Sequence, residues 1–113
     1  MIYKRDYNDL MKSVDRMMSR LNAEKDSNGA YHFDTACGKM RVKVDDFKPK
    51  KDYLWVFTQV ENPEKVPECY RNCSYFNKFS GKHNMYSRDI HFLYHWLWEY
   101  VVSCLPDGKR IDY

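Results

Sequence analysis

The chain has 113 residues, with 19 lysines and arginines against 16 acidic residues, and 17% of its residues are aromatic. This length predicts a single domain over residues 1–113 that can bury a core without disulfides or a structural metal. The net charge of +3 is smaller than that of a dedicated nucleic-acid binder. The sequence contains no run of about 18 apolar residues, which a membrane-spanning helix would need.

The first residues, MIYKRDYNDLMK, contain no apolar run followed by a cleavage site, so they do not resemble a secretory signal. We therefore expect a cytoplasmic protein that has no membrane partner. In that compartment the four cysteines are expected to stay reduced.

An amphipathic helix is predicted near the N-terminus, over about residues 6–24. Asp6 is a candidate N-cap, and the turn-forming residues 26–29 end the helix. Apolar residues recur at helical spacing on one face, at Tyr7, Leu10, Met11, Val14, Met17, Met18 and Leu21.

Three strands are predicted next, over residues 30–35, 39–45 and 52–60. In the second strand, the apolar side chains of Met40 and Val42 alternate with basic ones, as in a strand with one buried face. The short connections favour an antiparallel meander with the helix on one face.

Two helices are predicted in the last part of the chain. One begins near Val66, with Pro67 at its first position, and ends at Gly81. The other runs from about Ser87 to Cys104. The expected fold class is α+β, with an N-terminal helix, a three-stranded antiparallel sheet and two C-terminal helices.

The last predicted helix is apolar around nearly its whole circumference. Phe92 and Trp96 lie on the side that also carries Arg88 and Glu99. Unless another element covers them, these two rings form an exposed apolar patch, which is typical of a contact surface. A homodimer formed through this patch is therefore one expectation.

A zinc site is the most sharply defined chemical alternative. Cys69-x3-Cys73 is followed after 17 residues by His91-x3-His95, which resembles a stretched Cys2His2 set. However, both cysteines lie on the apolar stripe of a predicted helix, where buried free cysteine is common. We therefore expect no metal and no other cofactor, and these four residues remain the alternative.

An enzyme is not predicted. The sequence contains no nucleophile elbow, no zinc-protease motif, no phosphate-binding glycine loop and no dinucleotide fingerprint. Cys37 lies close to Lys39 in a turn-like segment, but no histidine is fixed beside it, although His32 is on the neighbouring predicted strand.

Nucleic-acid binding is an alternative function. The order helix, three strands, helix, with Lys82, His83 and Arg88 ahead of the last helix, resembles the double-stranded-RNA-binding domain, a family that reads A-form shape and phosphates. The resemblance covers element order, since residues 35–39 read TACGK where that family has a Gly-Pro-x-His element. A second basic group that could contact phosphates comprises Lys39, Arg41, Lys43, Lys48, Lys50 and Lys51.

Binding to a protein partner is the predicted function. Residues 69–88 contain no acidic residue, and on the predicted second helix basic and aromatic side chains share one face. Arginine and aromatic residues anchor many protein interfaces, and the positive charge favours an acidic partner. A phage or mobile-element inhibitor of a host defence enzyme fits this kind of small, non-catalytic protein. The predicted partner-binding residues are Arg71, Tyr75, Lys78, Phe79, Lys82, Arg88, Phe92 and Trp96.

Overall fold

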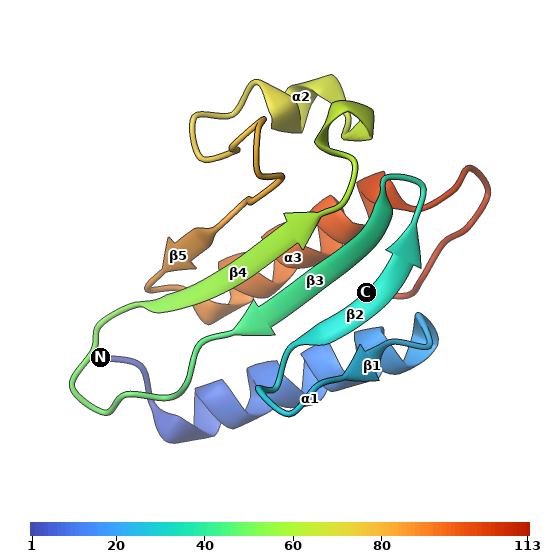
Figure 1. Ribbon diagram of the computed structural model, residues 1–113. Coiled ribbons are helices and arrows are strands. Elements are labelled where there is room, and N and C mark those ends of the chain that lie inside the picture. Colours follow the sequence, from blue (N-terminus) through green and yellow to red (C-terminus); the bar gives the residue numbers. More distant parts are fainter.

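Five strands form one antiparallel sheet in the order β1-β2-β3-β4-β5, and two long helices pack against it (Figure 1). The computed structural model describes all residues, 1–113. In chain order the elements are α1 (Lys4–Arg20), β1 (Glu24–Lys25), β2 (Tyr31–Thr35), β3 (Gly38–Val44), β4 (Leu54–Val60), the 3₁₀ turn η1 (Pro63–Lys65), α2 (Glu68–Arg71), β5 (Met85–Ser87) and α3 (Ile90–Cys104). The α+β class is confirmed.

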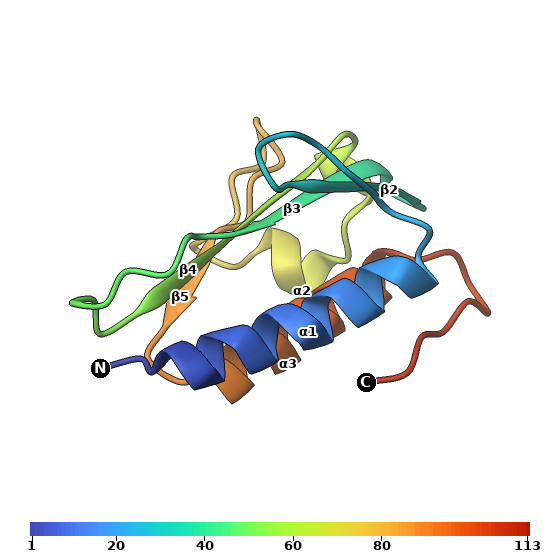
Figure 2. The same ribbon diagram turned by 90° about the horizontal axis from the view of Figure 1, so that it is seen from below.

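Both long helices lie on the same face of the sheet. Figure 2 shows α1 and α3 side by side beneath the strands, with no helix over the opposite face. The strands follow the same division, because side chains on β3 and β4 are alternately buried and partly exposed. The buried set on the helix side of the sheet includes Tyr31, Phe33, Met40, Val42, Val44, Leu54, Val56 and Val60.

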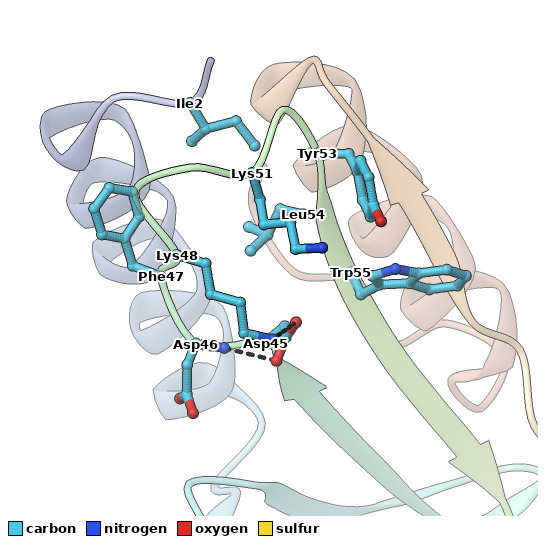
Figure 3. Close-up of a pocket in the computed structure, with 9 residues that line it drawn as sticks. All are labelled: Ile2, Asp45, Asp46, Phe47, Lys48, Lys51, Tyr53, Leu54 and Trp55. Atoms are coloured by element: carbon cyan, nitrogen blue, oxygen red, sulfur yellow. Dashed lines mark hydrogen bonds and ion pairs between the residues drawn. The ribbon is translucent and has the colours of Figure 1, made fainter.

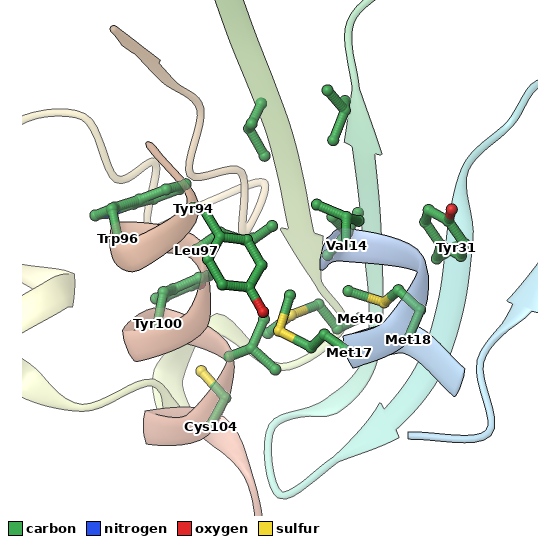
Figure 4. Packing of buried hydrophobic residues seen from close by; sticks show 14 of the residues in the cluster. Val14, Met17, Met18, Tyr31, Met40, Tyr94, Trp96, Leu97, Tyr100 and Cys104 are labelled. Carbon is green, nitrogen blue, oxygen red and sulfur yellow. The ribbon is translucent and has the colours of Figure 1, made fainter. Parts of the chain in front are cut away.

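The hydrophobic core fills the space between the helices and the sheet. Figure 4 shows side chains from α1, α3 and β3 converging there, with Met17 and Met40 directed into the same space. Val14, Leu97 and Val101 are fully buried in this layer. Each such side chain contributes about 1.5–3 kcal/mol by leaving water, so this layer supplies most of the stability of the fold.

The sheet has two more strands than the three predicted, because β1 and β5 add one short strand at each edge. Glu24, the last residue of the first predicted helix, and Lys25 pair with His32 and Tyr31 of β2 instead. Strands of two or three residues are too short for alternation to reveal them.

The predicted helix over residues 66–81 is wrong. Only α2, four residues long, is helical, and the following residues turn back toward β4. The amide N–H of Val60 donates to the carbonyl of Gly81 at 3.0 Å. Gly81 has φ +73°, and a Cβ there would lie 2.3 Å from the Val60 carbonyl oxygen. These contacts with β4 replace the internal hydrogen bonds that a longer helix would have made.

Trp96 is not part of an exposed patch, contrary to the alternative raised by its helical position. Its side chain is 8% exposed and its ring lies parallel to that of Tyr100, with centroids 5.8 Å apart. α2 and the segment between it and β5 cover this side of α3. This is shown by Tyr70 of α2 and His83 of the segment, whose rings both contact Tyr100. Phe92, one turn earlier, is 51% exposed.

We expect Trp96→Ala to lower the free energy of unfolding by about 3–5 kcal/mol, because it leaves a cavity among buried rings. The matched change Phe92→Ala removes an exposed ring from the same helix and should alter this free energy by about 0.5 kcal/mol or less. Urea unfolding of both variants measures the difference. Equal losses of stability would contradict the burial of Trp96.

Candidate functional site

The outer surface of the sheet carries the most distinctive group of side chains. We call it the open face, because no helix covers it (Figures 1 and 2). Successive side chains of a strand alternate between faces, so the buried set on β3 and β4 fixes which residues point outward. The open face comprises Lys39, Arg41 and Lys43 of β3, Trp55, Phe57 and Gln59 of β4, and Tyr86 of β5.

Aromatic rings form a continuous row on the open face. The rings of Trp55 and Phe57 are parallel within 1°, with centroids 5.9 Å apart. Tyr86, which pairs with Trp55 across the strands, has its ring 4.7 Å from the Trp55 ring. Tyr53 extends the row, 5.6 Å from Tyr86. Tyr53 and Tyr86 are exposed and Trp55 and Phe57 are partly exposed, and such a row edged by polar residues is typical of a contact surface.

A row of cations lies beside the rings, on β3. Lys43 is directly opposite Phe57, and Arg41 is opposite Gln59. Neither cation forms an ion pair, whereas Lys39 lies 3.7 Å from the carboxylate of Asp34. The open face therefore presents unneutralised positive charge next to flat apolar surfaces.

A hollow of about 310 Å³ lies at one end of the cation row, lined by Lys39, Arg41, Gln59 and His32 among others. The Nε2 of His32 donates to the carboxylate of Asp26 at 2.8 Å. This bond and the amide N–H of Ala30 lower the pKa of Asp26 to about 2, so the carboxylate stays ionised at neutral pH. The His32 ring is therefore held in place beside the hollow.

A second pocket, of about 110 Å³, lies near the other end of the ring row, where the β3–β4 loop meets the sheet (Figure 3). Rings of Phe47, Tyr53 and Trp55 line it, together with Asp45, Asp46, Lys48 and Lys51. Three contacts anchor the loop to the N-terminal part of the chain. The Tyr7 hydroxyl donates to the Asp45 carbonyl at 2.9 Å, and Phe47 packs on the Tyr7 ring. The N-terminal ammonium pairs with Asp52.

The six basic residues of the nucleic-acid alternative divide into three places. Lys39, Arg41 and Lys43 are together on the open face, and Lys48 and Lys51 line the second pocket. Lys50 is exposed in the same loop but does not line that pocket. Five of the six therefore border the ring row or its ends.

The predicted partner-binding residues do not share one helical face. Arg71 ends α2, Arg88 precedes α3, Lys82 pairs with Gln59 beside β4, and Trp96 is buried. Of the other predicted residues, Tyr75, Lys78 and Phe79 are exposed between α2 and β5, and Phe92 is exposed on α3.

A tight turn presents Phe79 to solvent. The side-chain oxygen of Asn77 accepts hydrogen bonds from the amides of Phe79, at 2.9 Å, and Ser80, at 3.0 Å. Asn77 itself is tied to Gly81 and Lys82 by backbone bonds. Phe79 is 99% exposed, so this turn holds a whole aromatic ring away from the protein.

The four residues of the zinc alternative are not assembled. Cys69 is exposed at the start of α2, and His95 on α3 lies 3.1 Å from the carboxylate of Glu99 instead. No group of three or more histidine, cysteine or acidic side chains is placed to hold a metal ion.

Cys37 is enclosed in the core near Cys104. Burial raises the pKa of the Cys37 thiol, and it raises the pKa of Cys104 to about 12. A buried thiol of high pKa is a poor nucleophile, because the thiolate is the reactive form. The turn-like sequence around Cys37 therefore does not provide a reactive site.

His83 is buried and does not add to a basic surface ahead of α3. Its ring is enclosed by those of Tyr70, Phe76, Trp96 and Tyr100, at centroid distances of 4.8–6.0 Å. Neither ring nitrogen has a hydrogen-bond partner. Burial lowers the pKa of His83 to about 4, so the imidazole is neutral at pH 7 and acts as a packing group.

The rings of Trp55, Phe57 and Tyr86 were missing from the sites predicted by sequence. The sequence does indicate that Trp55 and Phe57 point outward. Along residues 54–60 they and Gln59 alternate with the apolar residues Leu54, Val56 and Val60. Tyr86 carries no such signal, since its place depends on pairing with a distant strand.

Comparison with protein-family models, curated proteins and solved structures finds no match for this chain. None of its helices has both the length and the apolar character needed to cross a membrane.

We expect the buried His83 to make the protein less stable as the pH falls from about 6.5 to about 4. Over this range the unfolded chain binds a proton at this residue and the folded protein does not, which costs roughly 3 kcal/mol of unfolding free energy. Urea unfolding across this pH range should show a shallower decline for His83→Phe. The exposed-histidine control His91→Gln should decline like the unmodified protein, and an identical decline in His83→Phe would contradict the burial effect.

Proposed function

We propose that the protein binds single-stranded nucleic acid on its open face and has no catalytic activity of its own. The observation that carries this proposal is the row of rings, Trp55, Phe57 and Tyr86, beside the unpaired cations Arg41 and Lys43. Bases stack on exposed rings whatever their identity, and cations hold the phosphates that connect them.

A single strand fits this surface better than a duplex does. In a duplex the flat faces of the bases are stacked on one another and cannot reach side-chain rings. An unpaired strand exposes these faces, and open sheets with aromatic side chains stack two or three RNA bases in other protein families. The rings on β4 and β5 match that use, while the cations on β3 lie where the backbone would run.

The magnitude of the interaction follows from the same groups. Stacking on an aromatic ring contributes about 1–3 kcal/mol for each base. We expect three phosphate contacts, to Lys39, Arg41 and Lys43. Each phosphate of a single strand adds roughly −0.7 to the slope of log affinity against log salt concentration, so the slope should be about −2. We therefore expect affinities near the micromolar range at low salt.

The test is fluorescence anisotropy with uridine and thymidine oligonucleotides of roughly 12 nucleotides, over a series of salt concentrations. Trp55→Ala should weaken binding about tenfold, and Arg41→Gln combined with Lys43→Gln should make the salt dependence shallower. Lys12→Gln, an exposed change on α1, is the control for loss of a positive charge outside the open face.

Two results would overturn the proposal. One is the absence of binding to either oligonucleotide at low salt. The other is binding that Trp55→Ala and Lys12→Gln affect equally.

A second candidate function is binding to an acidic protein partner, which the exposed turn at Phe79 supports. The turn is held by hydrogen bonds to Asn77, so its ring enters a partner's apolar pocket with little loss of conformational freedom. Lys78 and Lys82 flank the ring, and Glu or Asp side chains at the rim of such a pocket would complement them. An inhibitor of a host defence enzyme is one form of this function and stays a prediction.

The two exposed phenylalanines provide a matched test of this candidate. Phe79→Ala should abolish capture of a protein partner from lysate of the source cells, whereas Phe92→Ala should retain it. The captured protein, once purified, should form the same complex in size-exclusion chromatography. If Phe79→Ala captures the partner as well as Phe92→Ala does, the Phe79 turn is not the binding surface.

A further inference from the structure

The pocket beside Trp55 adjoins the open face: Trp55 belongs to both, while Ile2 and Leu54 form its inner wall from the core side. Asp45, the first residue after β3, continues the alternation past Lys43, and its amide N–H donates to the Trp55 carbonyl at 3.0 Å. The outward row therefore reads Lys39, Arg41 and Lys43 on β3 and then Asp45 just beyond it. A single nucleic-acid strand bound along the ring row would therefore reach this pocket next.

The pocket is formed in advance of binding. The Asp45 carbonyl accepts from the Tyr7 hydroxyl, and Phe47 packs on the Tyr7 ring. The Lys4 ammonium contacts both rings, at 4.7 Å from the Phe47 centroid and 5.5 Å from that of Tyr7. Its volume of about 110 Å³ is of the same order as the roughly 150 Å³ cavity that admits benzene in an engineered protein. With one side open, it has room for the edge of a heterocyclic base, with the sugar outside.

The charges that line the pocket favour a neutral group. Asp45 and Asp46 balance Lys48 and Lys51, so a phosphate there would lie beside two carboxylates. A base edge, which presents both donors and acceptors, matches a wall that contains both carboxylates and ammonium groups. Phosphates are better placed along Arg41 and Lys43, where no acidic side chain forms an ion pair.

The hydrogen-bonding groups of the wall narrow the choice of base. The Asp45 carboxylate accepts from its neighbour's amide N–H at 2.9 Å and from the Lys48 ammonium at 3.2 Å, which leaves about two of its four lone-pair sites free. The Lys51 ammonium lies 5.7 Å from the Tyr53 ring centroid and pairs with no carboxylate (Figure 3). The wall thus offers a free acceptor pair close to a free donor.

Guanine is the base whose edge is complementary to this wall. Its N1–H and N2–H₂ groups are two adjacent donors for one carboxylate, and its O6 is an acceptor for an ammonium group. Adenine and cytosine each have one amino group next to a ring acceptor, and uracil has a single donor between two carbonyls. We propose that the pocket formed by Asp45, Lys51, Tyr53 and Trp55 takes one guanine base of the bound strand. This inference rests on the proposed binding of single strands by the open face.

The test uses uridine oligonucleotides of roughly 12 nucleotides that carry one central guanine, adenine, cytosine or inosine. Anisotropy should show the guanine strand binding about tenfold more tightly than the adenine strand, a difference within the range of one bidentate base contact. Inosine keeps O6 and N1–H but lacks the N2 amine, so it should bind more weakly than guanine.

Variants assign the preference to the pocket. Asp45→Asn should bring the ratio of guanine to adenine affinity close to one, because a carboxamide does not offer two acceptors, while the charge-matched Asp9→Asn on α1 should leave this ratio unchanged. Lys51→Met should reduce the ratio, and Lys50→Met, which changes the neighbouring lysine outside the pocket, should not. Circular dichroism confirms that each variant is folded.

The outcomes separate this inference from the proposed function. If the unsubstituted uridine strand binds but guanine gives no advantage, or if Asp45→Asn keeps the advantage, the guanine site is overturned and single-strand binding stands. If no oligonucleotide binds at low salt, both fall together.

Discussion

Val14 and Met17 of α1 and Leu97 and Val101 of α3 lie against the same face of the sheet, and the arrangement of the rest of the chain follows from that contact. The two helices meet each other and α3 also meets β4 and β5, so the core has a single layer of helices and a single layer of strands. A second layer of helices would have been needed to bury the other face, and the chain has only the short α2 and the segment around it left. These pack at the edge of α3, around His83.

The open face results from this arrangement, because the chain has no further helix to cover it. Strands with helices on one side usually carry polar residues on the other, as Lys39, Arg41 and Lys43 do on β3. On β4 and β5 the same positions hold Trp55, Phe57 and Tyr86. Rings at outward positions contribute less to stability than the same rings in the core, because they stay partly in contact with water. Their presence there supports the proposed binding role of this face.

The sequence predicts the elements whose periodicity is long enough to be read. The apolar spacing of α1 and the alternation along β3 are such cases, and the helix ending at Cys104 is another. The segment after Val66 misleads, because Cys69, Cys73 and Phe76 mimic helical spacing. Its real structure depends on the hydrogen bond from the Val60 amide to the Gly81 carbonyl, which no local pattern reveals.

The candidate site was predictable in part, for the same reason. The basic residues of β3 stand out in the sequence because they alternate with apolar ones. The rings become a site only through register, since Trp55 meets Tyr86 across two strands far apart in the chain. Likewise, Asp45 and Lys51 line one pocket because Tyr7 fixes the loop between them, and this contact cannot be inferred from spacing alone.

The position of β4 in the sheet determines how the conformational entropy lost on binding is divided between the protein and its ligand. β4 pairs with β3 on one side and with β5 on the other, so the backbone that carries Trp55 and Phe57 is already fixed. The rings are restrained by their neighbours as well, and little further order is imposed on the protein when a ligand arrives. For the single strand proposed as the ligand, the ordering cost then falls on the nucleic acid. The stiffness of that nucleic acid, more than protein motion, therefore sets the entropy lost on binding to such a face.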